Sequence, residues 1–414
     1  MNTPLKDHRQ LGQELELFFT DVVAPGAPFW LPKGMVIFRE LEKYIRELTE
    51  KAGYLETSTP IMVKSQLFKQ SGHFEKFGEH NMYNLQLSDE ADGTKFVSYT
   101  LKPMNCPEST ILYRFRPRSY RELPLRLSEI GRLHRREKSG EVNGLLRVRQ
   151  LTMDDAHIYA TEDQTFDEVS SILDMMMDFY KKFGFEYEFR LATRPETRAG
   201  SDEGWDKAEK ALAEALKKKG LKAGDKMGDG AFYGPKIDVH IKDSQGRDWQ
   251  LATVQLDFHM PEAFKLEYID ADGKTKRPVM IHRAIFGSFE RFTAILTEQY
   301  QGAFPTWLSP IQVQIIPISD QNMEYAQNVL EQLKSANLRV EADLRPGKMQ
   351  AKIRDAQLQK IPYMLIVGGR EEETKTVSVR TRSGEDLPLK EGRVGAMTAE
   401  EFIKKVKDEL DSKL

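Results

Sequence analysis

The sequence predicts an α/β protein of two domains. We expect an α+β domain over residues 1–305, built on an antiparallel sheet flanked by helices, and a small α/β domain with a mixed sheet over residues 306–414. Apolar residues recur at helical spacing between Met35 and Ala52, whereas apolar and polar residues alternate at both ends of the segment Leu123–Tyr159, which is typical of a long antiparallel hairpin. After the proline-containing segment Phe304–Pro310 strand and helix patterns alternate, which indicates parallel pairing in the smaller domain.

The larger predicted domain opens with the helix 35–52, which Gly53 closes, followed by a strand over residues 54–60. The hairpin 123–159 encloses a charged loop at residues 134–144. Further helices are predicted at 165–183, 203–219 and 288–300, and short strands at 189–194, 237–241, 254–258 and 278–281. In the smaller domain we expect strands at 311–317, 338–343, 363–368 and 376–382, and helices at 322–336, 348–360 and from 399, the last started by a capping box over Thr398–Glu401.

The composition sets the class of protein. The chain has 414 residues, a net charge of −3, and 40% hydrophobic and 30% charged residues, which excludes wholesale disorder. Cys106 is the only cysteine, so an intrachain disulfide, a four-cysteine zinc ribbon and a Cys-x-x-Cys redox site are excluded. A single cysteine favours a reducing compartment, and we expect a cytoplasmic protein. No apolar run approaches the roughly 20 residues that span a bilayer, so no membrane partner is expected.

Positive charge concentrates in the hairpin, where residues 114–149 carry a net charge of +7. The chain has neither a Gly-x4-Gly-Lys-Ser/Thr loop nor a Gly-x-Gly-x-x-Gly turn between a strand and a helix, so phosphate binding must come from arginines, whose planar fork grips two phosphate oxygens. The alternative is a solvated basic face, which is the usual meaning of a charge run. We favour phosphate binding because these cations lie on a strand pattern and its loop.

Three residues form a candidate metal-ligand set. Cys106 lies in a proline-bracketed turn, and His157 and His282 lie in strand-like segments. One thiolate and two imidazoles suit a zinc ion with one open position for substrate. The sequence alone does not bring the three together, and with eight histidines the alternative of ordinary core or surface histidines stays open.

Three stretches together resemble the signature motifs of class II aminoacyl-tRNA synthetases. They are the helix and strand Met35–Pro60, the strand–loop–strand formed by Leu125–Glu137 and Arg147–Arg149, and Gly287–Arg291. Five shorter segments narrow the resemblance to the threonyl-tRNA synthetase family, and it extends over nearly the whole chain. They are Lys102–Pro107, Asp154–Ile158, Ala231–Lys236, Val254–Asp257 and His282–Ile285. The resemblance implies a class II catalytic domain over residues 1–305 and an anticodon-binding domain over residues 306–414.

The resemblance implies a threonine–tRNA ligase. Such an enzyme activates threonine with ATP and Mg²⁺ to threonyl-adenylate and pyrophosphate, and then transfers threonine to the 3′ end of tRNA(Thr). It implies one zinc ion per subunit, held by Cys106, His157 and His282 and chelated by threonine, a site that rejects valine because valine lacks the hydroxyl group.

The resemblance also implies roles for individual residues. The amino-acid pocket would be formed by Asp155, Tyr233 and Gln255, with Lys236 nearby. ATP would be bound by Arg135, Glu137, Arg147 and Arg291, of which Arg135 and Arg291 stabilise the charge of the reaction. His73 would lie near the terminal ribose and assist proton removal. For each residue the alternative is a structural role.

In the predicted anticodon-binding domain, residues 339–360 carry a net charge of +3. The candidates for anticodon contact are Arg345, Lys348, Lys352 and Arg354, with a solvated helix face as the alternative. The remaining expected partner is a second copy of the chain, joined as a homodimer through Met35–Pro60; no DNA partner is expected.

The sequence departs from the family in three ways. The resemblance begins at the catalytic core, so we expect the family's N-terminal region, which hydrolyses mischarged seryl-tRNA, to be absent. Met153 stands where a glutamine is expected near the amino-acid carboxylate, and methionine cannot donate that hydrogen bond. Glu108-Ser109 replaces Gly-His, and Asn143 replaces a loop histidine. Two alternatives therefore stay open: a non-catalytic RNA-binding or regulatory paralogue, and a synthetase of altered amino-acid specificity, for example for serine.

Overall fold

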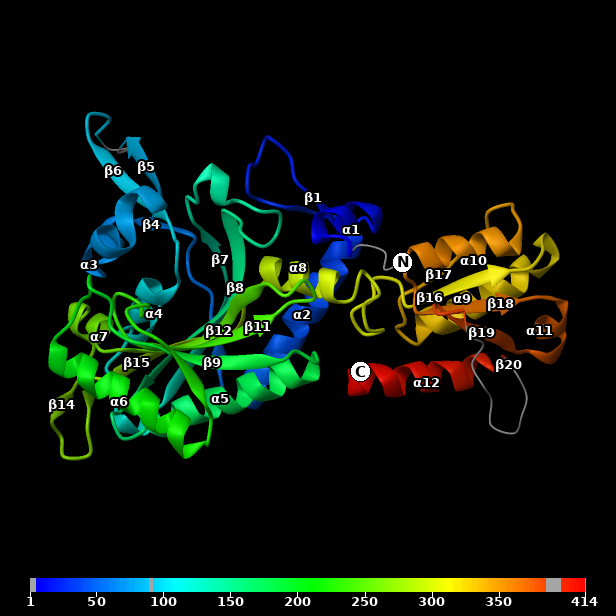
Figure 1. The fold of residues 1–414 in the computed structure, drawn as a ribbon. Coiled ribbons are helices and arrows are strands. Elements are labelled where there is room, and N and C mark those ends of the chain that lie inside the picture. Colours follow the sequence, from blue (N-terminus) through cyan, green and yellow to red (C-terminus); the bar gives the residue numbers. More distant parts are fainter. Residues whose placement is uncertain (1–4, 89–91, 385–395, 414) are drawn as a thin grey trace. The chain divides into compact units, whose positions relative to one another are not determined.

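The computed structural model describes residues 5–88, 92–384 and 396–413 and divides into two compact units (Figure 1). The larger unit comprises residues 20–28 and 42–295, and the smaller unit comprises residues 1–19, 29–41 and 296–414. The predicted domain boundary at residue 305 stays a prediction.

The larger unit is built on an eight-stranded sheet with the order β10-β9-β11-β12-β15-β8-β7-β3. Only the two outermost pairs, β10 with β9 and β3 with β7, are parallel. The other neighbours are antiparallel, which confirms the predicted sheet class. The strands are β3 (Leu55–Glu56), β7 (Leu125–His134), β8 (Gln150–Ala160), β9 (Tyr187–Ala192), β10 (Ala223–Lys226), β11 (Lys236–Lys242), β12 (Asp248–Asp257) and β15 (Val279–Ser288).

Helices α5 (Thr165–Lys182) and α6 (Asp202–Lys218) pack together on one face of this sheet. The α5 helix buries Phe179 against Phe286 and Phe292, so an aromatic cluster joins the helix to the sheet. The α6 helix starts at Ser201, whose hydroxyl accepts the N–H of Gly204, and lysines occupy its last turn, as the helix dipole favours.

Shorter elements complete the larger unit. A second sheet has the order β4-β6-β5, and a hairpin joins β13 to β14. These elements are β4 (Met62–Lys64), β5 (Tyr83–Ser88), β6 (Phe96–Leu101), β13 (Tyr268–Ile269), β14 (Thr275–Lys276), α3 (Gln66–Gln70), α4 (Cys106–Tyr113) and α7 (His259–Ala263), with single turns at Phe74–Gly78, Glu79–Asn81, Tyr120–Glu122 and Ser139–Glu141. Cys106 was expected in a turn; instead it begins α4, because Pro107 suits the first turn of a helix.

The smaller unit contains a five-stranded mixed sheet with the order β17-β16-β18-β19-β20, parallel on one side of β18 and antiparallel on the other. This confirms the predicted mixed sheet. Its elements are α1 (His8–Glu14), β1 (Phe18–Phe19), β2 (Phe29–Trp30), β16 (Val313–Pro317), a turn at Asp320–Asn322, α9 (Met323–Ser335), β17 (Val340–Ala342), α10 (Met349–Leu358), β18 (Tyr363–Val367), α11 (Gly369–Thr374), β19 (Val377–Thr381), β20 (Ala396–Met397) and α12 (Ala399–Ser412). The capping box of Thr398 with Glu401 starts α12 as predicted.

Two helices have residues in both units: α2 (Pro32–Lys51) and α8 (Phe289–Gln299). Both match predicted helices to within a few residues. The strand predicted after α2 is much shorter than expected, because only Leu55 and Glu56 pair with β7. Across the described residues no helix combines the length and apolar character that crossing a bilayer requires.

Candidate active site

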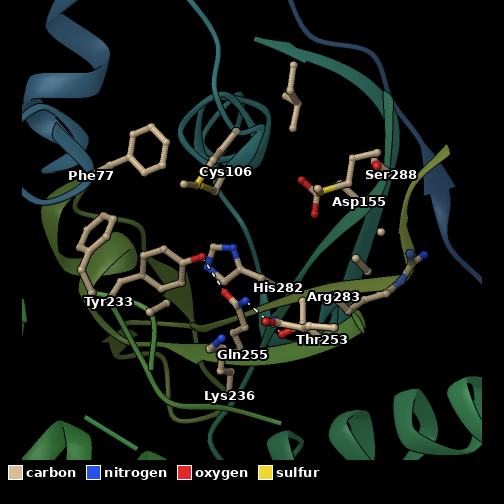
Figure 2. A pocket seen from close by; sticks show the side chains of 18 of the residues that line it. Phe77, Cys106, Asp155, Tyr233, Lys236, Thr253, Gln255, His282, Arg283 and Ser288 are labelled. Carbon is tan, nitrogen blue, oxygen red and sulfur yellow. Dashed lines mark hydrogen bonds between the residues drawn. The ribbon is translucent and has the colours of Figure 1, made fainter. Parts of the chain in front are cut away.

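The candidate site is a cavity of about 620 Å³ in the larger unit, on the β7, β8, β12 and β15 part of the sheet (Figure 2). Strand side chains alternate between faces, and on β8 the cavity is lined by Met153, Asp155 and His157, each two positions from the next. The same rule brings Thr253 and Gln255 of β12 to the cavity. The polar wall therefore follows from strand register.

Strand pairing also assembles the candidate metal ligands. His282 on β15 lies directly opposite His157 on β8, and Gln255 on β12 lies opposite His282. The rings of His157 and His282 meet edge to face with centroids 5.0 Å apart. Cys106 reaches the pair from the start of α4, and one donor atom from each of the three residues lies within 4.8 Å of the others. The structure thus brings together the three residues that the sequence could not connect.

The three side chains are almost fully buried: Cys106 is 2% exposed, His157 is 3% exposed and His282 is 5% exposed. Burial raises the pKa of the Cys106 thiol well above its usual range, and it lowers the pKa of His157. A soft thiolate with two imidazoles is a donor set that binds zinc and leaves an open position, so the residues present fit this metal.

Asp155 lies beside this cluster in the cavity wall (Figure 2). Its Oδ2 accepts a hydrogen bond of 2.9 Å from the side-chain amide of Asn105 and lies 3.9 Å from Nε2 of His157. Burial raises the pKa of Asp155, and the Asn105 bond acts in the opposite direction by stabilising the carboxylate. Sequence reasoning missed Asn105, whose signal was its place immediately before Cys106.

Tyr233 and Gln255 form the opposite part of the wall. The Tyr233 hydroxyl donates to Oε1 of Gln255 at 2.6 Å, and the ring of Tyr233 stacks on His282 with centroids 4.7 Å apart. The amide of Gln255 in turn donates to Thr253, and Thr253 donates to Asp238. Lys236 also lines the cavity, with its Nζ 2.8 Å from Asp238. This chain of bonds fixes the amide orientation of Gln255 (Figure 2).

Three arginines line the same cavity; Arg283 on β15 is paired with Asp154, whereas Arg135 and Arg291 come from other elements. Arg135 follows β7, and its Nε donates to the carbonyl of Pro103; Arg291 on α8 donates to the carbonyls of Leu146 and Gln250. Burial lowers the pKa of Arg291, and the charges of Arg135 and Arg147 add to the effect. Two mutually repelling guanidinium groups in one cavity create a site for an anion.

The other expected site residues lie outside the lining of this cavity. Glu137 and Arg147 form an ion pair at 2.8 Å in the charged loop. His73 is completely buried; its Nδ1 lies 2.8 Å from the hydroxyl of Ser71 and its Nε2 lies 3.6 Å from Sγ of Cys106. Burial lowers the pKa of His73 to about 3. His73 thus contacts Cys106 of the metal-ligand cluster without lining the cavity. Its role near a ribose stays a prediction.

The four anticodon candidates differ in exposure. Arg345, Lys348 and Arg354 are exposed, although Arg345 is paired with Asp343 and Asp355. Lys352 is only 5% exposed, and its Nζ donates to the carbonyl of Asp343 at 2.9 Å. Lys352 thus serves the fold of the smaller unit in this conformation, because the spacing of α10 turns it toward the sheet.

Comparisons with known proteins agree with this geometry. The profile of the "tRNA synthetase class II core domain (G, H, P, S and T)" matches residues 90–300, and that of the "Anticodon binding domain" matches residues 312–409. The chain is 51% identical over 409 residues to the threonine–tRNA ligase of Clostridium kluyveri, and 51% identical over 408 residues to that of Clostridium botulinum (strain Langeland). It covers 62% of the length of these relatives, which in turn match 99% of this chain.

Two solved structures share the fold. A crystal structure described as the RNA binding domain of threonyl-tRNA synthetase from Cryptosporidium parvum aligns with a TM-score of 0.91 at 39% identity, covering 97% of this chain and 98% of that one. The putative threonyl-tRNA synthetase ThrRS-1 of Aeropyrum pernix aligns with a TM-score of 0.83 at 28% identity, covering 99% and 96%. The chain belongs to the class II aminoacyl-tRNA synthetase family, with a class II core followed by an anticodon-binding domain.

Proposed function

We propose that this chain is the synthetic core of a threonine–tRNA ligase, which forms threonyl-adenylate and pyrophosphate from threonine and ATP and then esterifies the 3′ end of tRNA(Thr). The observation that carries the proposal is the cluster of Cys106, His157 and His282 in the wall of a cavity that Arg135 and Arg291 also line. The names of the 51%-identical relatives support the same activity.

Amino-acid recognition would depend on polar groups in the cavity wall. A zinc ion bound to the three ligands would offer its open position to the amino and hydroxyl groups of threonine. Asp155 lies within 4 Å of His157 and would accept the substrate hydroxyl. Tyr233 and Gln255 would form another part of the pocket wall. Valine has the same shape but no hydroxyl group, so it would offer Asp155 no substrate donor, which is how such sites reject an isostere.

Nucleotide binding would depend on Arg135 and Arg291. Arg135 would hold the α-phosphate and the threonine carboxylate, and Arg291 would bind the far end of the triphosphate that accompanies Mg²⁺. The carboxylate attacks the α-phosphorus in line, and positioned cations stabilise the charge that develops. Glu137 and Arg147 would seat the nucleotide after their ion pair rearranges, Lys236 would lie beside the pocket, and His73 would act near the ribose.

The remaining partners follow from the rest of the chain. We propose that residues 306–414 bind the anticodon through exposed cations, Arg345, Lys348 and Arg354, and that Lys352 contributes only if its bond to Asp343 opens. A homodimer through Met35–Pro60 is supported by the exposed apolar side chain of Leu55 in that segment and by those of Ile61 and Met62 directly after it. The proposed location is the cytoplasm.

The deciding experiment is amino-acid-dependent ATP–pyrophosphate exchange, measured for threonine, serine and valine with bound zinc determined in parallel. We expect exchange with threonine, weaker exchange with serine and none above background with valine. Zinc-loaded protein without any exchange would indicate the non-catalytic paralogue. A preference for serine would indicate altered specificity. The comparison with serine is needed because Met153 lies in the cavity wall.

A further inference from the structure

Asp257, the last residue of β12, has no exposed surface and touches both the backbone of α7 and one of the candidate metal ligands. Its Oδ1 accepts the backbone N–H groups of His259 and Met260, both at 2.8 Å. Its Oδ2 lies 2.9 Å from Nε2 of His282. The two oxygens therefore have different partners. The two backbone bonds to Oδ1 fix the orientation of the carboxylate and so keep Oδ2 beside His282.

The bond between Asp257 and His282 determines which ring nitrogen of His282 carries the proton. A carboxylate offers only acceptors, so the imidazole supplies the hydrogen, from Nε2. A neutral imidazole with its proton on Nε2 has its lone pair on Nδ1, and only a lone pair can bind a metal ion. With Nε2 occupied by Asp257, Nδ1 is the atom of His282 that remains for the cluster with Cys106 and His157.

We propose that Asp257 is a positioning residue that fixes the Nε2–H form and the ring orientation of His282, so that Nδ1 is presented to the metal ion. This inference rests on the proposed zinc site. Carboxylates that accept the second N–H of a metal-binding histidine raise its basicity and restrict its rotation. His157 has no comparable support from Asp155, because the separation of 3.9 Å is too long for a hydrogen bond.

The replacement Asp257→Asn tests the tautomer rather than the packing. The amide oxygen retains the N–H groups of His259 and Met260, which prevents the amide from turning over. The amide nitrogen then faces Nε2 of His282 and donates to it, so the ring proton moves to Nδ1 and removes the lone pair from the metal site. We expect zinc affinity to fall by about 10–100-fold, the range for loss of such outer partners.

Asp243→Asn is the matched control. Asp243 is also buried, and its Oδ1 likewise accepts two backbone N–H groups, those of Gln245 and Arg247. Its Oδ2 accepts the ring N–H of Trp249 and the Nε–H of Arg247, and its hydrogen bonds lead to no candidate metal ligand. This variant loses a buried carboxylate in the same local geometry, so we expect zinc affinity within twofold of the unaltered chain.

Two measurements on the full chain test the inference without an activity assay. Zinc affinity is measured by competition with a fluorescent chelator. The tautomer of His282 in the metal-free protein is read from long-range ¹⁵N–¹H correlation spectra, with the signal identified by its loss in His282→Asn. Support requires the Nε2–H form in the unaltered chain, its reversal in Asp257→Asn, and weakened zinc binding in that variant alone.

The inference is overturned if metal-free His282 carries its proton on Nδ1, a result that needs no variant to fold. It is also overturned if Asp257→Asn binds zinc as tightly as the unaltered chain. An unaltered chain that binds no zinc while showing the Nε2–H form would overturn the proposed metal site itself and the inference with it. Zinc binding with unchanged affinity in Asp257→Asn overturns only the role of Asp257.

Discussion

Gly131 on β7 lies outside the cavity lining but faces Asn105, whose side-chain amide bonds Asp155 in the cavity wall. A Cβ at this position would come within 2.4–2.7 Å of the side-chain amide of Asn105, where ordinary contacts begin at 3.4 Å. The amide would have to withdraw by about 1 Å, which lengthens its 2.9 Å bond to Asp155 to about 3.9 Å and breaks it. We therefore expect Gly131→Ala to act on threonine recognition through Asn105.

The expected magnitude follows from the bond that is lost. A hydrogen bond to a charged group contributes about 1.5–3 kcal/mol, which corresponds to a loss of roughly 10–150-fold in kcat/KM for threonine. The assay is threonine-dependent ATP–pyrophosphate exchange at saturating ATP, with bound zinc and the thermal unfolding midpoint measured on the same samples. Zinc content should be unchanged, because the three atoms nearest the added Cβ all belong to the side chain of Asn105 and not to a metal ligand.

A double-mutant cycle separates this explanation from general damage to β7. Asn105→Ala removes the amide, so an added methyl group at residue 131 no longer meets it. Gly131→Ala should then cost much less in the Asn105→Ala background than alone. Additive losses, or kcat/KM for threonine within twofold of the unaltered chain in Gly131→Ala, would refute the reasoning.

Three further predictions follow. Cys106→Ser should lower zinc affinity by more than about tenfold in a chelator competition, because a serine hydroxyl does not replace a soft thiolate; unchanged affinity would remove Cys106 from the ligand set. Burial raises the pKa of Glu290 from 4.5 to about 7, so the folded chain retains a proton that the unfolded chain releases, and stability is lost as pH rises from about 4.5 through 7. In denaturant titrations at several pH values Glu290→Gln should abolish that loss, about 3 kcal/mol at 1.4 kcal/mol per unit; an unchanged slope would contradict it. Lys352→Met should destabilise the smaller unit by about 1–3 kcal/mol, because it loses the bond to Asp343. Arg354→Ala should leave the melting midpoint unchanged and weaken tRNA binding. The opposite pattern would contradict the assignment of a structural role to the buried Lys352.

Local patterns in the sequence were sufficient for many of the regular elements, although not for those between residues 61 and 113. The helical spacing after Met35, the alternation at both ends of the hairpin, and the cap at Thr398 all predict elements that the structure contains. Period-two alternation could also have found part of the wall, since Met153, Asp155 and His157 fall on one face of any strand through them.

Long-range pairing could not be read from the sequence. Cys106, His157 and His282 come from three distant segments, and only the pairing of β8 with β15 brings the two histidines opposite each other. No local pattern encodes which strands pair when more than a hundred residues separate them. Asp257 was missed for a related reason: its role depends on His282, a diagonal neighbour on the adjacent strand β15, although its place two residues after Gln255 put it on the same face.

Adjacent acidic residues of β8 couple the two halves of the candidate site. Asp155 faces the cavity, so Asp154 faces away from it, and its carboxylate accepts the N–H groups of three consecutive residues of β15, Ile285, Phe286 and Gly287. Those residues form the irregularity where the pairing of β8 with β15 shifts, and Gly287 has a positive φ of 78° there. The turn ends at Ser288, α8 begins at the next residue, and its third residue is Arg291. We therefore expect a displacement of β8 that moves Asp155 to move the start of α8 as well, which would link the proposed amino-acid pocket to the proposed anion site at Arg291.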